Sequence, residues 1–202
     1  MNQQEELWAG QFGDQYHGRR HRDVSDAVAF FDEALFGNIG VAPAVIEFGA
    51  GVGTNLRAIR EIAPAAELSA VEINLQALNK LRTIGLSAVF EGSILDWKAA
   101  PNWDLVISKG LLIHIAPADL PRAYAALYGS CRRSILIAEY FSTHLQAVPY
   151  REQLSALWKG PYAYQLLDAY SDLRLVNYGF VSSRDNSMAE DDINWFLLEK
   201  IS

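Results

Sequence analysis

The chain has 202 residues, of which 50% are hydrophobic and 20% are charged, and its formal net charge is -7 with a pI near 5.1. This composition is that of a globular protein that can bury a substantial core, and it excludes a fibrous or disordered chain. The negative charge disfavours DNA and RNA as partners, because affinity for nucleic acid comes from Lys and Arg side chains that neutralise phosphates.

Nothing in the sequence indicates a membrane span or a secretory signal. The longest apolar runs, such as Ile135 to Ala138, are far shorter than the roughly 20 residues that cross a bilayer. The first residues, MNQQEE, are acidic where a signal peptide is basic and then apolar. No repeat or long linker divides the chain. We therefore expect a single domain in the cytoplasm, with no membrane partner.

The first 40 residues precede the regular part of the pattern. Apolar residues at Val24, Val28, Phe31 and Leu35 recur at helical spacing and predict an amphipathic helix from Val24 to Phe36. The glycines and the proline that follow, within GNIGVAP, end this helix because they interrupt its hydrogen bonds.

From residue 44 onward, short apolar runs alternate with helical patterns, which is typical of βαβ units and a parallel sheet buried on both faces. The runs predict strands at Ala44 to Phe48, Glu67 to Glu72, Ala88 to Glu91, Asp104 to Ser108 and Ser134 to Glu139. Between them we expect helices at Thr54 to Ile62, Leu75 to Thr83 and Ala118 to Gly129. The last helix has Asp119 in its first turn, where a carboxylate complements the helix dipole.

The remainder of the chain departs from this alternation. A loop and a helix are expected through Trp158 to Tyr170, followed by strands at Leu173 to Ser182 and Asn194 to Lys200. The polar connection between these two strands has no room for a crossover helix, so they form an antiparallel hairpin. The predicted fold is α/β: a Rossmann-like, doubly wound, seven-stranded sheet of five parallel strands and a C-terminal antiparallel hairpin, with helices on both faces and an N-terminal helical cap.

The first predicted strand leads directly into a glycine-rich loop. Doubly wound sheets bind ligands beyond the carboxyl ends of their strands, usually after the first one. Gly49, Gly51 and Gly53 allow the backbone to approach a ligand closely, and with Ala50 they form the loop. A helix begins with Thr54 and Asn55, and its free N–H groups favour an anion.

Two details distinguish this loop from a dinucleotide-binding one. The dinucleotide fingerprint requires glycine at its sixth position, where this chain has Thr54. Glu47, two residues before the first glycine, would repel a pyrophosphate, whereas it suits a ligand that carries a sulfonium and an ammonium. The loop therefore indicates S-adenosylmethionine as the cofactor, with a nicotinamide-dependent oxidoreductase as the competing interpretation.

Two further segments complete this cofactor site. Glu72, at the end of the second strand, is placed to accept hydrogen bonds from the ribose hydroxyls, with Ile73 beside it. After the third strand, Gly92, Ser93 and Ile94 could frame the adenine, and the Ser93 hydroxyl can accept from its amino group. Asp96 is the other candidate for that contact, unless it only caps a turn.

These motifs resemble those of the class I S-adenosylmethionine-dependent methyltransferases. Longer segments resemble the pseudaminic acid biosynthesis-associated methylase family over nearly the whole chain: LWAGQFGDQY near the N-terminus, SKGLLIHI after the fourth strand, AEY after the fifth, and DDINWFLL near the C-terminus. This resemblance implies association with bacterial surface-sugar or nonulosonic acid pathways. It also implies cofactor contacts at Tyr16, Arg19, Lys109 and Gly110, with Trp8 and Phe12 in a cap over the methionine end. His17, Gly18 and Arg20 depart from the family pattern around Arg19.

Methyl transfer is a displacement at a sulfonium carbon, so the enzyme aligns the two reactants and excludes water. A base is needed only if the acceptor arrives protonated, and His114 is the candidate, since an unperturbed histidine titrates near pH 6.5. The alternative is a histidine that only packs against the next helix. Glu139 and Tyr140 end the fifth strand at the same edge and could contact the acceptor, and Arg151 could bind an anionic group. We expect no metal.

The sequence thus predicts a methyltransferase that uses S-adenosylmethionine to methylate an oxygen or nitrogen of a small, sugar-like acceptor. The open alternatives are a methyltransferase for another metabolite or natural product, and a non-catalytic protein that binds the cofactor. Residues 1–40 would form the cap, residues 41–140 the cofactor-binding half, and residues 141–202 a lid and the terminal hairpin.

Overall fold

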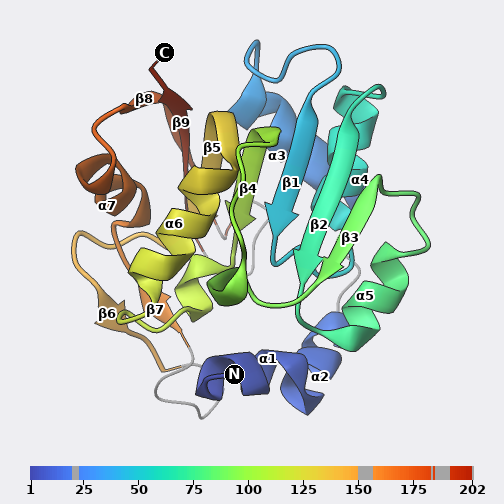
Figure 1. Cartoon of the computed structure of the whole chain (residues 1–202), viewed down its shortest axis with the longest axis vertical. Helices are drawn as coiled ribbons and strands as arrows, with labels where there is room; N and C mark the ends of the chain where they lie inside the picture. The colour runs from blue at the N-terminus through green and yellow to red at the C-terminus, as the bar shows by residue number, and fades with distance from the viewer. Residues whose placement is uncertain (20–22, 150–156, 183, 185–191, 202) are drawn as a thin grey trace.

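The computed structural model describes residues 1–19, 23–149, 157–182, 184 and 192–201, without the side chains of residues 18 and 19. Its main feature is a seven-stranded sheet in the order β3-β2-β1-β4-β5-β9-β8 (Figure 1). The strands are β1 (Ala44–Phe48), β2 (Glu67–Glu72), β3 (Ala88–Glu91), β4 (Trp103–Lys109), β5 (Cys131–Glu139), β8 (Leu173–Val181) and β9 (Ile193–Lys200). β1 to β5 are parallel, and β9 pairs antiparallel with both β5 and β8. The predicted fold class is confirmed.

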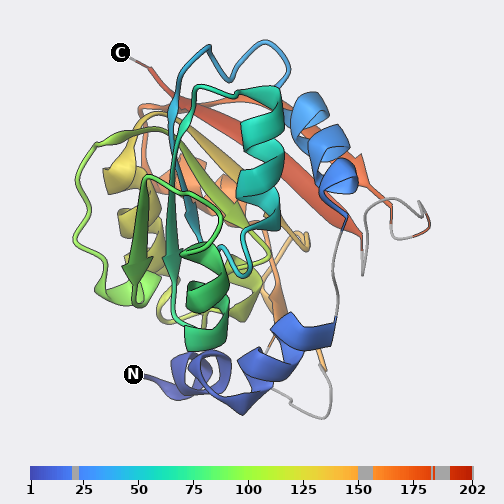
Figure 2. The same cartoon turned by 90° about the vertical axis from the view of Figure 1, so that its right-hand side faces the viewer.

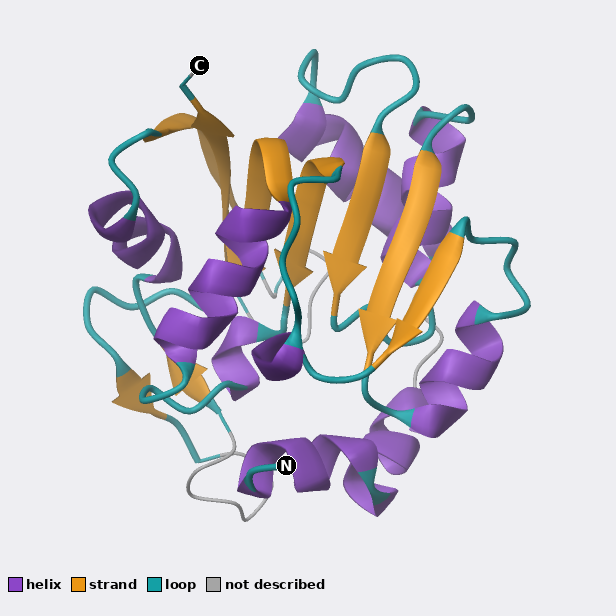
Figure 3. Ribbon diagram, in the orientation of Figure 1, coloured by secondary structure: helices purple, strands orange, loops and turns teal. Residues whose placement is uncertain are grey.

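Helices cover both faces of the sheet (Figures 2 and 3). One face is covered by α3 (Val24–Leu35), α4 (Thr54–Ile62) and α5 (Leu75–Leu81). The other is covered by α6 (Leu120–Ser130) and α7 (Tyr162–Ala169). Asp119 is the N-cap residue of α6, one position before the first turn where the sequence placed it.

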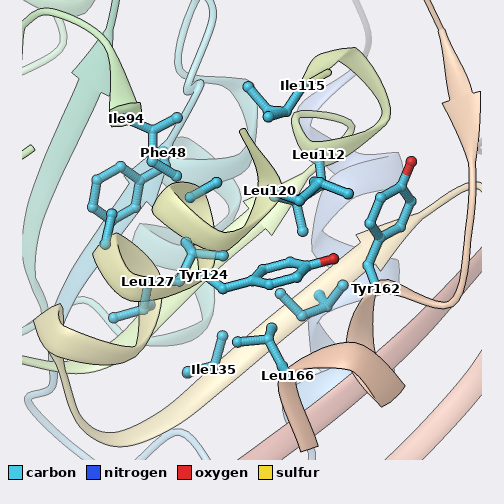
Figure 4. Close-up of a cluster of buried hydrophobic side chains, with 14 of the residues drawn as sticks. Phe48, Ile94, Leu112, Ile115, Leu120, Tyr124, Leu127, Ile135, Tyr162 and Leu166 are labelled. Atoms are coloured by element: carbon cyan, nitrogen blue, oxygen red, sulfur yellow. The ribbon is translucent and has the colours of Figure 1, made fainter. Parts of the chain in front are cut away.

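The strands at the centre of the sheet are buried on both sides and separate two apolar cores. Phe48 and Ile135 face α6 and α7, where they pack with Tyr124, Leu127 and Leu166 (Figure 4). The other core joins the opposite face of the same strands to α3, α4 and α5. This double burial explains why the strands read as almost continuous apolar runs.

A helical cap was predicted for the N-terminal region, but the bounds of its first two helices and a short additional ribbon were not. The first 19 residues form two short helices, α1 (Gln3–Ala9) and α2 (Gln11–Arg19), which lie below the carboxyl ends of the strands (Figures 1 and 2). A separate two-stranded ribbon consists of β6 (Gln146–Ala147) and β7 (Trp158–Lys159). Elements this short show no readable apolar period. A signal for α1 was nevertheless present, since Asn2 and Glu5 form a capping box.

In the part of the chain that the structure describes, every helix is too short or too polar to cross a membrane.

Candidate active site

A pocket of about 790 Å³, counting the part that opens to solvent, lies between the carboxyl edge of the sheet and the helices α1 and α2. The lining residues come from α1, α2 and the ends of four strands: Asn2, Gln4, Glu5, Trp8, Tyr16, His17, Gly49, Val71, Glu72, Ile73, Gly92, Ser93, Ile94, Leu95, Gly110, Leu111, His114 and Ile115. The sheet edge therefore brings together the predicted loops after β1, β2, β3 and β4.

Of the glycine loop, Gly49 lines the pocket, whereas Ala50, Gly51, Gly53, Thr54 and Asn55 lie outside its lining. Gly49 has φ of 69°, and a Cβ there would lie 2.9 Å from the Leu111 side chain. Gly53, the N-cap residue of α4, has φ of 83°, and a Cβ there would meet Ile84. Both positions require glycine, because L side chains rarely adopt this conformation and no space is left for one.

Glu47 lies beneath this loop and is fully buried. Its Oε1 accepts a hydrogen bond from Nδ2 of Asn55, whereas its Oε2 has no partner among the described residues. Burial raises the pKa of Glu47 to about 8, although Asn55 and the charge of Lys109 act in the opposite direction. A buried carboxylate oxygen without a donor is costly.

Glu72 lies at the end of β2 and lines the pocket. Its Oε2 accepts from the backbone N–H of Gly51 at 2.7 Å, and its Oε1 accepts from those of Ile73 and Asn74 at 2.9 and 2.8 Å. These bonds tie the glycine loop to β2. Because an ionised carboxylate has about four lone-pair positions, Glu72 can still accept from ligand hydroxyls.

The loop after β3 continues as the short 3-10 helix η1 (Ile94–Asp96). Ser93 caps η1, with its hydroxyl oxygen accepting from the N–H of Leu95 at 3.0 Å. Asp96 does not line the pocket: its side chain is 74% exposed and pairs with Arg122 at 3.3 Å. Of the two residues considered for the adenine contact, only Ser93 lies at the pocket.

An aromatic cluster on α1 and α2 closes the pocket from the other side. The Trp8 ring packs against His114 with ring centroids 4.3 Å apart, and against Phe12 and Tyr16 at 5.2 and 5.3 Å. His114 ends the 3-10 helix η2 (Leu112–His114) after β4 and is 9% exposed. The side chain of Arg19, and the predicted lid residues Tyr150 and Arg151, lie outside the described residues.

The buried amide of Asn74 attaches this aromatic cap to the sheet edge. Its Oδ1 accepts from the N–H of Ala77 and so caps α5. Its Nδ2 donates to Oδ1 of Asp14 at 2.8 Å and to the carbonyl oxygen of Trp8 at 3.2 Å. One side chain thus stabilises both α5 and the position of α1 and α2.

Replacing Asn74 with aspartate should release α1 and α2 while leaving α5 capped. The new carboxylate still accepts from Ala77, but it cannot donate and it faces the Asp14 carboxylate. We expect backbone amides of α1 and α2 to exchange hydrogen about 10- to 100-fold faster, with α5 unchanged. Asn74→Ala should loosen both regions, and the exposed Asn79→Asp is the control. Equal protection of α1 in Asn74→Asp and wild type would show that this amide does not hold the cap.

Glu139 and Tyr140 do not line the pocket, although the sequence placed them among the groups that could contact the acceptor. The Glu139 carboxylate accepts from Ser108 Oγ at 2.8 Å and from the N–H groups of Leu111, Leu112 and Ile113. It therefore fixes the turn from β4 into η2, which carries His114. The Tyr140 ring lies under Nζ of Lys159, 5.3 Å from its centroid.

Lys109 also lies away from the pocket, with its Nζ 5.3 Å from the centre of the Phe30 ring. Trp8 lines the pocket, as expected for a residue of the cap. Several other lining residues were not predicted as site residues: Asn2, Gln4, Glu5, His17, Val71, Leu95, Leu111 and Ile115. Most of them belong to the first two helices or to apolar positions in turns. The capping-box pattern at Asn2 and Glu5 was one signal in the sequence, and the family resemblance of the segment that contains Leu111 and Ile115 was another.

Solved structures of methyltransferases share this architecture. The magnesium protoporphyrin IX methyltransferase from Synechocystis with bound S-adenosylmethionine aligns with a TM-score of 0.70 at 12% identity, over 99% of this chain and 98% of that one. The 1,6-didemethyltoxoflavin-N1-methyltransferase of Burkholderia thailandensis aligns with a TM-score of 0.68 at 16% identity, over 89% and 78%. The plantazolicin methyltransferase, in complex with S-adenosylhomocysteine, aligns with a TM-score of 0.64 at 14% identity, over 98% and 94%.

No protein-family model matches the sequence, and no curated protein matches it. The resemblance to the pseudaminic acid family therefore rests on the sequence motifs alone. The strand order, the antiparallel pairing of β9 and the structural neighbours agree with one another. The chain has the Rossmann-like fold of the S-adenosylmethionine-dependent methyltransferases.

Proposed function

We propose that the protein is a methyltransferase that uses S-adenosylmethionine to methylate an oxygen or nitrogen of a small acceptor. The observation that carries the proposal is the unpartnered Oε2 of Glu47, buried under a glycine loop at the carboxyl edge of the sheet. The α-ammonium group of the cofactor would provide the missing charged donor. A dinucleotide would instead bring its pyrophosphate towards this acid.

The residues around the pocket fit the remaining parts of the cofactor. Glu72 would accept from the ribose hydroxyls, and the loop from Gly92 to Ile94 would contact the base. The free N–H groups at the start of α4, beginning at Thr54, favour the carboxylate of the methionine part. When bound, the cofactor supplies an electrophilic methyl group on a cationic sulfur. In this proposal, residues 1–40 act as the cap and residues 41–140 as the cofactor-binding half.

His114 is the group that would remove a proton from the acceptor. It lines the pocket, and its ring is held against Trp8. Glu139 acts as a positioning residue, because its carboxylate binds the N–H groups of the turn that carries His114. Tyr16 and Trp8 cover the pocket and limit the access of water. Water exclusion and alignment are the main requirements of a methyl transfer.

For the acceptor we propose a sugar-like molecule of a nonulosonic acid or nucleotide-sugar pathway. The support is the resemblance of the segments around Tyr16, His114 and Trp195 to the pseudaminic acid biosynthesis-associated methylases. Two of the structural neighbours are methyltransferases named for other small molecules, didemethyltoxoflavin and plantazolicin. An aromatic metabolite or a peptide natural product is therefore the comparison class for an acceptor screen.

The decisive experiment incubates the protein with S-adenosylmethionine labelled on its methyl group and a panel of sugar nucleotides, nonulosonic acids and aromatic metabolites. We expect label to enter a sugar-like acceptor. The control is Gly51→Val, since Gly51 has φ of 56° and an added Cβ would lie 3.1 Å from His17. Transfer only to aromatic metabolites would refute the acceptor class. Binding of NAD without binding of S-adenosylmethionine would refute the methyltransferase itself.

A further inference from the structure

Glu5 is an acidic pocket residue for which the proposed reaction has so far no role. It lies on α1 and lines the pocket, and its side chain is only 10% exposed. Its Oε2 accepts from the backbone N–H of Asn2 at 2.6 Å and lies 3.9 Å from the N-terminal ammonium of Met1, so these contacts engage one of its two oxygens. A nearly buried carboxylate that faces a ligand pocket is expected to bind a ligand donor.

A chain of hydrogen bonds locates Glu5 at one end of the pocket. Nδ2 of Asn2 donates to Oδ2 of Asp119, at the start of α6, at 2.8 Å. Arg122, one turn further on, bonds to Asp119 at 3.4 Å and donates to the carbonyl oxygen of Leu95 at 2.8 Å. The beginning of α1 is therefore attached to the loop that follows β3.

The order of the strands indicates which part of the cofactor reaches this end. The loops after β1, β2 and β3 lie side by side, because the sheet order is β3-β2-β1. If the ribose lies at Glu72 and the methionine at the glycine loop after β1, the base extends towards Ser93 and Leu95. Glu5 thus lies where the adenine would be bound.

The polar side chains Ser93 and Asp96 of the loop after β3 already form contacts within the protein. The Ser93 hydroxyl already accepts from Leu95, which leaves it one neutral acceptor position, and the Asp96 carboxylate pairs with Arg122 outside the pocket. A hydrogen bond to a charged acceptor is stronger than one to a neutral hydroxyl. A carboxylate that lines the pocket is present on α1.

We propose that Glu5 accepts a hydrogen bond from the exocyclic amino group of the adenine of S-adenosylmethionine, and that α1 thereby selects the base. This inference rests on the proposed function. It makes the N-terminal helix part of the cofactor site, in addition to its covering role.

The test compares two ligands in each protein variant by calorimetry: S-adenosylhomocysteine, and its purine analogue that lacks the amino group. In the wild type, loss of the amino group should weaken binding about tenfold or more, since it leaves the Glu5 carboxylate unpaired. In Glu5→Met this preference should fall to about twofold. Both ligands meet the same α1 in a given variant, so the ratio of their affinities is insensitive to fraying of the helix.

Two variants sharpen the comparison. Glu5→Gln keeps an oxygen acceptor and can still form the capping box, so it should retain part of the preference. Glu6→Met alters an exposed neighbour on the same helix, which does not line the pocket, and should retain all of it. If Glu5→Met discriminates between the two ligands as the wild type does, then Glu5 does not bind the adenine amino group. Binding of both ligands would in that case still support the proposed cofactor site. If wild type binds neither ligand, the proposed function fails with it.

Discussion

Replacing Glu47 with glutamine should weaken the binding of S-adenosylhomocysteine, which carries the same ammonium group as the cofactor, by about 10- to 100-fold. Glutamine preserves the shape of the side chain and can still accept from Asn55. It cannot provide a negative charge, and it presents an amide N–H where wild type has the unpartnered Oε2. Calorimetric titration of both proteins measures the difference.

The pH dependence of this binding provides a more specific readout. Below pH 8 the buried Glu47 is protonated, since its pKa is raised to about 8, and it must lose this proton to pair with an ammonium. At higher pH the α-ammonium group of the ligand loses its proton in turn. Wild-type affinity should therefore rise as pH increases through about 8 and fall again where the ligand amine titrates. The affinity of Glu47→Gln for S-adenosylhomocysteine should not fall as pH decreases below 8.

The same carboxylate should reduce the stability of the ligand-free protein at neutral pH. Between the ordinary glutamate value of 4.5 and about 8, the folded protein keeps a proton that the unfolded chain has released. The free energy of unfolding therefore falls as pH rises through this window, and Glu47→Gln should not show the fall. The exposed Glu67→Gln is the matched control. Unchanged affinity with an unchanged pH profile would contradict the role given to Glu47.

Replacing His114 with phenylalanine should lower kcat by about 10²- to 10⁴-fold, the usual contribution of a general base. Phenylalanine keeps an aromatic ring against Trp8, so the packing that holds the cap should survive. The affinity for S-adenosylhomocysteine should change little, and the acidic limb of the pH profile of kcat/KM should disappear. Steady-state kinetics with the acceptor found in the labelled-methyl screen measure both quantities.

A matched control for this variant is His144→Phe, which changes an exposed histidine outside the pocket lining. It should leave kcat unaltered. If His114→Phe retains kcat within about fivefold of wild type and the same pH profile, then His114 only packs against Trp8. The acceptor would in that case arrive already deprotonated, and alignment alone would account for the rate.

The two buried acids Glu47 and Glu139 differ in how many hydrogen bonds the protein donates to their carboxylates. Glu139 is 3% exposed, and its carboxylate accepts four hydrogen bonds from Ser108 and the turn after β4. Glu47 is fully buried and accepts one from Asn55, which leaves an oxygen without a donor. The first acid is satisfied by the protein, whereas the second requires a ligand. We therefore assign Glu139 to positioning and Glu47 to binding.

Much of the fold follows from local sequence signals. β1, β2, β3 and α4 begin and end where the apolar runs and their glycine boundaries predict. The antiparallel pairing of β8 and β9 follows from a connection too short for a crossover helix. The glycine loop, Glu72 and Ser93 could be assigned to one pocket because parallel strands present their carboxyl ends at a common edge.

The sequence by itself thus determined the sheet, its two covered faces and the three loops that suggest the cofactor. The family resemblance also placed residues 1–40 in a cap over these loops, but only the tertiary structure decided which contacts hold that cap. The bonds from Asn74 to Asp14 and from Asn2 to Asp119 join residues 60 and 117 positions apart, and no local period encodes such contacts. The same distinction applies to the acids: Glu47, Glu139 and Glu5 are alike in sequence. Folding gives Glu139 four hydrogen-bond donors from the protein, whereas Glu47 and Glu5 receive one each, which is why we propose ligand contacts for these two only.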